Sequence, residues 1–111
     1  MGYKRGDIVL VDFNPAKGGE IGKLRPAVVM SSAEEVRMLQ TVIVIPLSTV
    51  IEPDSFPYRY TLKPRERLKK QSDACIYEIR ALSKKRIKEK IADLSKDELQ
   101  SIQRGLCTIL G

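Results

Sequence analysis

The sequence predicts a mainly β (α+β) fold: a small, strongly curved antiparallel barrel with a short inserted helix and a C-terminal helix. Apolar and β-branched residues gather in short runs that end at proline, asparagine or serine, which is typical of short strands joined by turns. Strand–helix–strand alternation does not repeat, and this disfavours a doubly wound parallel sheet. A chain of 111 residues predicts one domain, spanning residues 1–111.

The first two strands are expected on either side of a glycine-rich loop. Residues 7–13 are mostly apolar and end at Asn14-Pro15, which predicts a strand and then a turn. Residues 26–30 predict the second strand. Pro26 suits the first position of that strand, because the missing N–H does least harm there.

A short helix and a third strand are expected next. Ser31 and Ser32 precede two glutamates, a helix-start signal that predicts one or two turns to about Met38. The apolar run 41–47 predicts a buried strand that ends at Pro46 and Ser48.

The second half of the chain predicts further strands and one longer helix. Residues 56–62 alternate with bulky side chains, and Pro57 favours an edge strand, in which Phe56, Tyr58 and Tyr60 share one face. Residues 74–82 predict a strand bent near residue 78, and residues 83–94 fit a helical turn followed by a strand. Ser95 and Glu98 have capping-box spacing before an apolar stripe at helical spacing: Leu99, Ile102, Leu106, Ile109 and Leu110.

The net charge and the cysteine content indicate which kinds of partner and which cellular compartment to expect. The net charge of +6 favours polyanionic partners, although many small proteins are basic for solubility alone. Cys75 and Cys107 lie in apolar runs and are expected to be buried and reduced. No segment has the ~18 apolar residues of a spanning helix. We therefore expect a cytoplasmic protein with no membrane partner.

The loop 18–26 carries the most chemical information. It places one carboxylate, Glu20, five positions before one guanidinium, Arg25, directly in front of an apolar strand. The chain has no histidine, so few other residues can perform acid–base chemistry. This pair predicts a phosphate-binding and acid–base site. The alternative is that Glu20 is a solvated loop residue and Arg25 a surface cation.

Several motifs match one known family. The segment RGDIVLVDFNP at 5–15, the residues Gly18, Gly19 and Glu20, and LRPAVV at 24–29 resemble the MazF/PemK family of toxin–antitoxin toxins. PLST at 46–49 and EIRAL at 78–82 resemble that family's later motifs. The resemblance covers nearly the whole chain.

The resemblance implies an SH3-like barrel that forms a homodimer and cuts single-stranded RNA within a short sequence, without a metal or other cofactor. It also implies a cognate antitoxin whose acidic tail fills the RNA groove, and contact with operator DNA through that antitoxin. The family's catalytic residues fall on Arg25, Glu20 and Ser48. The RNA-binding residues expected with them are Lys17, Gly18, Gly19, Lys23, Thr49 and Arg80.

Two positions depart from the family pattern. Ser48 keeps the hydroxyl of the family's threonine but lacks its methyl group. Tyr77 stands where some members carry an acidic residue, and Glu78 stands where glutamine is common.

Cleavage by the RNA's own 2′-hydroxyl needs a base, a group that stabilises the phosphorane charge, and an acid for the leaving 5′ oxygen. Arg25 suits charge stabilisation, because its planar fork holds two phosphate oxygens. Glu20 is the better candidate base, since a guanidinium holds its proton tightly and gives it up reluctantly. Ser48 is expected to donate a hydrogen bond to the phosphate, with a simple turn-forming role as its alternative.

Two other functions stay open at the level of sequence. The same barrel can hold nucleic acid or an acidic peptide without catalysis. A related barrel also hosts gyrase poisons, and a fold alone does not exclude that activity. The basic runs 63–70 and 84–86 are expected to be mostly solvated, with two or three phosphate contacts.

Overall fold

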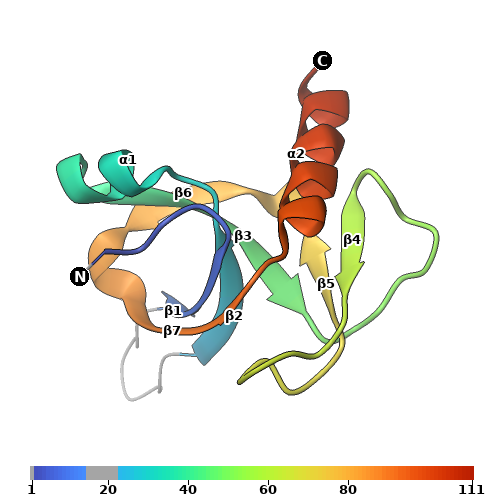
Figure 1. Cartoon of the computed structure of the whole chain (residues 1–111), viewed down its shortest axis with the longest axis horizontal. Helices are drawn as coiled ribbons and strands as arrows, with labels where there is room; N and C mark the ends of the chain where they lie inside the picture. Colours follow the sequence, from blue (N-terminus) through green and yellow to red (C-terminus); the bar gives the residue numbers. More distant parts are fainter. Residues whose placement is uncertain (1, 15–22) are drawn as a thin grey trace.

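The computed structural model describes residues 2–14 and 23–111, which form a curled antiparallel sheet with two helices (Figure 1). In these residues six of the seven strands follow the order β4-β5-β3-β2-β1-β7, and the seventh, β6, pairs separately with β3. The strands are β1 (Asp7–Asn14), β2 (Lys23–Val29), β3 (Thr41–Ser48), β4 (Arg59–Leu62), β5 (Ser72–Cys75), β6 (Arg80–Ser83) and β7 (Ile87–Asp93). The helices are α1 (Ala33–Met38) and α2 (Lys96–Leu110), with 3-10 turns η1 (Ile76–Glu78) and η2 (Lys84–Arg86). The predicted barrel-like, mainly β architecture is confirmed.

Two apolar clusters lie on opposite faces of the sheet. Successive side chains of a strand point to opposite faces, so Ile8 and Val9 are both fully buried but belong to different clusters. The larger cluster includes Val28 and Ile45 and packs against Ile102 of α2. The smaller one consists mainly of valines from β1, β2 and β3 and includes Val36 of α1. The functional residues described below extend the face of this second cluster.

Proline positions differ from the sequence prediction in β2 and β3. β2 begins at Lys23, so Pro26 lies inside the strand, opposite Leu10 of β1, rather than at its first position. The pairing of β2 with β3 begins at Ala27, and Pro26 therefore has a paired neighbour on one side only. Pro46 does not end β3, which continues to Ser48, and Ile43 of that strand is 43% exposed rather than buried.

The strand predicted from residue 56 begins only at Arg59. The amide N–H groups of Tyr58 and Arg59 both donate to the carbonyl of Ser55, and this turn replaces the expected start of the strand. Phe56 and Tyr58 therefore lie in the preceding turn and are about half exposed, so the expectation of one shared strand face is wrong for them. β4 is an edge strand, as predicted.

The remaining elements follow the sequence with two corrections. The predicted strand 74–82 is split by η1 into β5 and β6, whereas the turn and strand expected in 83–94 are η2 and β7. The capping box of Ser95 and Glu98 is present at the start of α2. Cys75 is buried as expected, but Cys107 is exposed because it lies on the solvent side of α2. Both cysteines are free.

Basic residues close the open side of the curled sheet. Arg65, in the β4–β5 connection, forms a two-fold ion pair with Glu98 of α2. The N–H of Arg67 donates to the carbonyl of Ile91 in β7 at 3.2 Å, and its guanidinium pairs with Glu89 at 2.9 Å. Part of the basic run 63–70 thus holds the fold together rather than being simply solvated. In the described part of the chain, no helix is long and apolar enough to cross a membrane.

Candidate functional site

Arg25 and Ser48 come to the same end of neighbouring strands. β2 and β3 pair at Ala27 and Pro46, and Arg25 precedes Ala27 by two residues just as Ser48 follows Pro46 by two. Because side chains repeat on one face every second residue, Arg25 and Ser48 extend the same face at the same edge. Arg25 is exposed and makes no ion pair with any residue in 2–14 or 23–111.

The hydroxyl of Ser48 keeps its proton available. Its Oγ accepts a hydrogen bond from the N–H of Val50 at 3.1 Å, which satisfies an acceptor position, and among residues 2–14 and 23–111 the O–H has no acceptor, so it can donate to a ligand. This bond also begins the turn after β3, so the turn-forming role considered for Ser48 and a phosphate-donating role are compatible. Thr49, the next residue, is exposed and lies on another surface, where it lines a cavity of about 420 Å³ with Arg67, Lys69 and Lys70.

Arg80 adds a second cation to the Arg25 face. It lies on β6 opposite Val44 of β3, whose side chain belongs to the same buried cluster as Val11 of β1. The Arg80 guanidinium lies 4.5 Å from the centre of the Phe13 ring, a cation–π contact that orients the guanidinium. Arg25 and Arg80 therefore bracket the strand that ends in Ser48.

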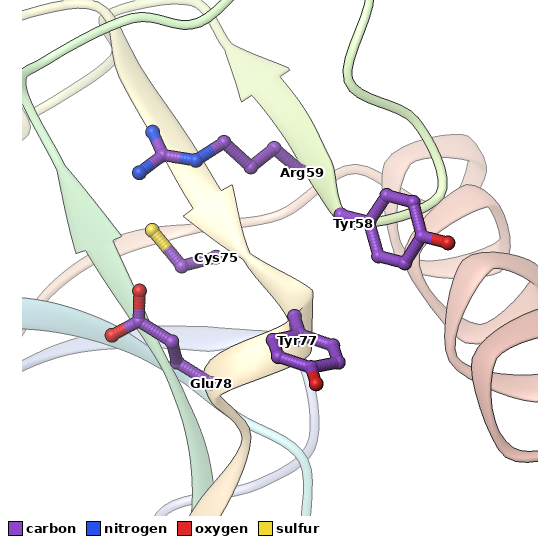
Figure 2. A pocket seen from close by; sticks show the side chains of 5 residues that line it. All are labelled: Tyr58, Arg59, Cys75, Tyr77 and Glu78. Carbon is purple, nitrogen blue, oxygen red and sulfur yellow. The ribbon is translucent and has the colours of Figure 1, made fainter.

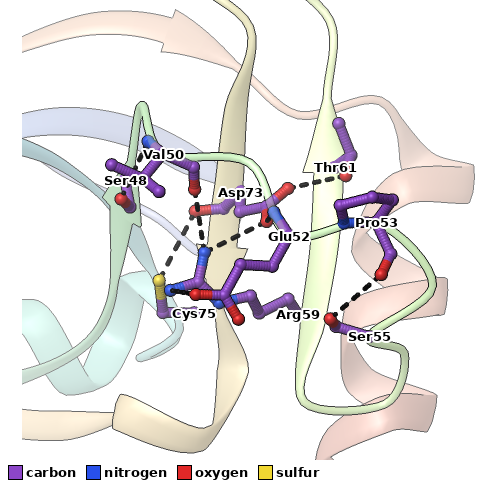
Figure 3. A network of polar contacts seen from close by, with 9 residues as sticks. All are labelled: Ser48, Val50, Glu52, Pro53, Ser55, Arg59, Thr61, Asp73 and Cys75. Carbon is purple, nitrogen blue, oxygen red and sulfur yellow. Dashed lines mark hydrogen bonds and ion pairs between the residues drawn. The ribbon is translucent and has the colours of Figure 1, made fainter.

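A buried carboxylate holds the loop behind Ser48 (Figure 3). Asp73 of β5 pairs with Ser48 of β3 and is fully buried. Its carboxylate accepts hydrogen bonds from the Thr61 hydroxyl at 2.6 Å, the Glu52 N–H at 2.9 Å and the Arg59 guanidinium at 3.1 Å. The same Arg59 nitrogen donates to the Val50 carbonyl at 2.9 Å. These bonds fix the loop 49–55 against the end of β3.

This network sets the ionisation of its members. Burial acts to raise the pKa of Asp73, but the donors from Glu52, Thr61 and Arg59 outweigh it and hold the pKa below its ordinary value. The hydrogen bond to Asp73 raises the pKa of Arg59 above its ordinary value. Sequence reasoning missed both residues. The only signal was a polar pair, Ser72-Asp73, directly before the apolar residues of the expected strand.

A second cavity, also of about 420 Å³, lies next to this network (Figure 2). Tyr58, Arg59, Cys75, Tyr77 and Glu78 line it. The Tyr58 and Tyr77 rings meet edge to face with their centres 5.9 Å apart, and both side chains are more than half exposed. Burial raises the pKa of the Cys75 thiol, whose Sγ donates to the Asp73 carbonyl at 3.7 Å.

Several predicted site residues lie outside the described residues: Lys17, Gly18, Gly19 and Glu20, together with the side chain of Lys23. Lys23 itself begins β2 and pairs with Asn14 of β1. The described residues hold no group of three or more His, Cys, Asp or Glu side chains arranged to bind a metal ion.

The chain matches the family model described as "PemK-like, MazF-like toxin of type II toxin-antitoxin system" over residues 4–110. A Staphylococcus epidermidis relative, "Endoribonuclease MazF", is 33% identical over 109 residues, which cover 97% of this chain and 91% of the relative. A solved MazE-MazF structure from Deinococcus radiodurans has a TM-score of 0.83 and 24% identity, covering 100% of this chain and 97% of that chain. A mycobacterial endoribonuclease solved with its cognate antitoxin has a TM-score of 0.77 and 18% identity, covering 98% and 95%.

The barrel-like fold and the match to the family model together identify a small, mainly β toxin of a type II toxin–antitoxin system. The chain belongs to the PemK-like, MazF-like toxin family. Within that family it is an endoribonuclease toxin of the MazF type.

Proposed function

We propose that this endoribonuclease cuts single-stranded RNA, at a selected sequence, at the edge where Arg25 and Ser48 lie side by side. The register of β2 and β3 is the observation that supports this site, because it aligns a guanidinium with a hydroxyl on one rigid face. Attack of the RNA's 2′-hydroxyl on the adjacent phosphorus breaks the bond to the 5′ oxygen. The products are a 2′,3′-cyclic phosphate and a 5′-hydroxyl end.

In this mechanism Arg25 neutralises the charge that develops on the phosphorane oxygens, a role in which a planar two-pronged donor is effective. Ser48 donates its free O–H to the same phosphate while Val50 holds its oxygen in place. Glu20 takes the 2′ proton, and a neighbouring donor or water returns a proton to the leaving 5′ oxygen. No metal ion or other cofactor takes part in this scheme.

The same cationic face supports the proposed partners. We propose that a cognate antitoxin inactivates the toxin by laying an acidic tail over Arg25 and Arg80, where it competes with RNA for the cations. The similar structures include a MazE-MazF structure from Deinococcus radiodurans and a mycobacterial endoribonuclease in complex with its cognate antitoxin. We further propose a homodimer, a cytoplasmic location beside cellular RNA, and operator DNA contact through the antitoxin.

Incubation of the purified protein with a long RNA in EDTA tests the activity. We expect cleavage with cyclic-phosphate ends, and a loss of at least ~100-fold in Arg25→Ala, the scale of removing one charge-stabilising donor. Lys88→Ala is the matched control, since Lys88 is an exposed cation on β7. Near-normal cleavage by Arg25→Ala would rule out this mechanism. Intact RNA with retained binding would indicate a non-catalytic module, and DNA breaks without RNA loss in growing cells would indicate a gyrase poison.

A further inference from the structure

The cavity beside the Asp73 network has the properties of a nucleobase site. Tyr58 and Tyr77 are 55% and 69% exposed, an unusual amount of aromatic surface to leave in water. The Tyr77 N–H donates to the Tyr58 carbonyl at 3.2 Å, so the backbone holds the two residues together. Exposed aromatic rings on a rigid backbone are the usual platform on which single-stranded nucleic acid stacks its bases.

The cavity also lies close to the candidate cleavage site. Asp73 is opposite Ser48, and Cys75 follows Asp73 by two residues on the same strand, a distance of about 7 Å at the ~3.3 Å rise of a strand. Tyr77 and Glu78 follow directly in η1. A base adjacent to the phosphate at Ser48 can therefore reach this cavity.

The polar groups of the cavity have unused hydrogen-bonding capacity. Glu78 is exposed, and its carboxylate makes no hydrogen bond or ion pair with the residues that the structure describes. Figure 2 shows Glu78 and Arg59 on either side of Cys75, so a carboxylate and a guanidinium face one small space. Because Arg59 is held by Asp73 and Val50, its position is fixed before any ligand arrives.

The charged groups that line the cavity, Glu78 and Arg59, favour one of the four bases over the others. An ionised carboxylate only accepts hydrogen bonds, and its two oxygens match two adjacent N–H donors. Guanine alone has two adjacent donors, N1–H and the N2 amino group, on its Watson–Crick edge, with the O6 acceptor beside them. Uracil has one N–H between two carbonyl oxygens, which a carboxylate repels, while adenine and cytosine each have an amino group beside a ring-nitrogen acceptor. Arg59 supplies positive charge for a carbonyl oxygen such as O6.

We propose that this cavity binds an unpaired guanine next to the cleaved bond, with the base stacked on the Tyr58–Tyr77 pair and its N1–H and N2 amino group donating to Glu78. The proposal rests on the proposed RNA-cleaving function and adds a base preference to it. It makes Glu78 and Tyr77 specificity-determining residues, distinct from the groups that act on the phosphate.

Binding to short RNA probes tests the cavity separately from cleavage. The probes are uridine heptamers with guanosine, inosine, adenosine, cytidine or uridine at the central position, and the protein carries Arg25→Ala to prevent cutting. We expect the guanosine probe to bind at least about fivefold more tightly than the inosine probe, which lacks only the N2 amino group. Equal binding of the two probes would overturn the proposal.

Variants of the cavity give the second readout, with folding checked by circular dichroism. Glu78→Gln should remove the preference for guanosine over inosine, and Tyr77→Ala should weaken binding of every probe by about fivefold or more. Tyr77→Phe separates the ring from the hydroxyl, and we expect a smaller loss than with alanine. A guanosine preference that persists in Glu78→Gln would also overturn the proposal.

Cleavage maps distinguish this proposal from the function on which it rests. If the wild-type protein cuts RNA but its cut sites show no nearby guanosine, the guanine proposal fails and the endoribonuclease stands. If the protein binds the guanosine probe selectively but cuts no RNA, the cleavage mechanism fails instead. Guanosine-flanked cut sites that lose this preference in Glu78→Gln support both.

Discussion

Asp73 lies directly opposite Ser48 across the β3–β5 pair, and its buried carboxylate ties the loop that follows Ser48 to Arg59. The loop that follows the candidate phosphate-binding hydroxyl is thus held by a buried charge pair, and its carboxylate, Asp73, acts through Arg59 and this loop. This arrangement makes Asp73 a positioning residue.

Replacement of Asp73 should affect both stability and cleavage. Asp73→Ala leaves Arg59 without its buried partner and removes the acceptor of the Thr61 and Glu52 bonds, so we expect a loss of about 3 kcal/mol in the free energy of unfolding. Urea unfolding measures it. Asp73→Asn keeps the shape of the side chain, so we expect a smaller loss in the free energy of unfolding. We also expect kcat to fall, because the loop after Ser48 is held less firmly. Unchanged stability in Asp73→Ala would contradict the positioning role.

Acid should destabilise the fold by protonating carboxylates whose pKa the folded state lowers, among them Asp73 and Glu98. The pKa of Asp73 is lowered despite its burial, and the ion pair with Arg65 lowers the pKa of Glu98. A lowered pKa contributes stability above the unfolded value of about 4, and this contribution disappears as the pH falls through the folded value. The free energy of unfolding should therefore be flat above about pH 5 and fall below about pH 4. In Glu98→Gln this fall should be smaller. A pH profile identical to that of the wild type would show that Glu98 does not contribute to the loss of stability in acid.

Two substitutions at Ser48 test whether its hydroxyl contributes to cleavage. Ser48→Ala removes the donor and should lower the cleavage rate by about 100-fold, with KM less affected, if the hydrogen bond strengthens in the transition state. Ser48→Thr keeps the hydroxyl and restores the residue that the family resemblance implies, so it should retain most of the activity. Single-turnover cleavage of one labelled RNA measures both. A normal kcat in Ser48→Ala would show that Ser48 only forms the turn after β3 and does not act on the phosphate.

Gly105 marks a close contact between α2 and the turn before β4. A Cβ at this position would lie 3.0 Å from the Ile76 side chain and 3.1 Å from the Pro57 carbonyl. Overpacking costs about 1–3 kcal/mol, which outweighs the ~1 kcal/mol that alanine contributes inside a helix. We expect Gly105→Ala to lower the melting temperature, and Cys107→Ala, at an exposed position of the same helix, to change it little. An increase in the melting temperature of Gly105→Ala would show that the turn moves freely.

Local sequence signals determined the elements that depend on short-range chemistry. The capping boxes of Ser32 and Ser95 define the starts of both helices, because a cap bonds within four residues. The motif residues indicate the family and include the candidate site residues Arg25 and Ser48. The stretches 56–58 and 74–82 were mispredicted because a turn and η1 interrupt apolar patterns that otherwise favour strands.

Only the tertiary structure decided how distant segments meet. The strand register aligns Arg25 with Ser48, and the fold brings Asp73 to Arg59 and Glu98 to Arg65. No local pattern encodes these pairings, since each depends on which strands become neighbours and on the phase in which they pair. For the same reason, the sequence by itself showed that tyrosines are present, whereas only the folded chain placed Tyr58 and Tyr77 around one cavity with Glu78.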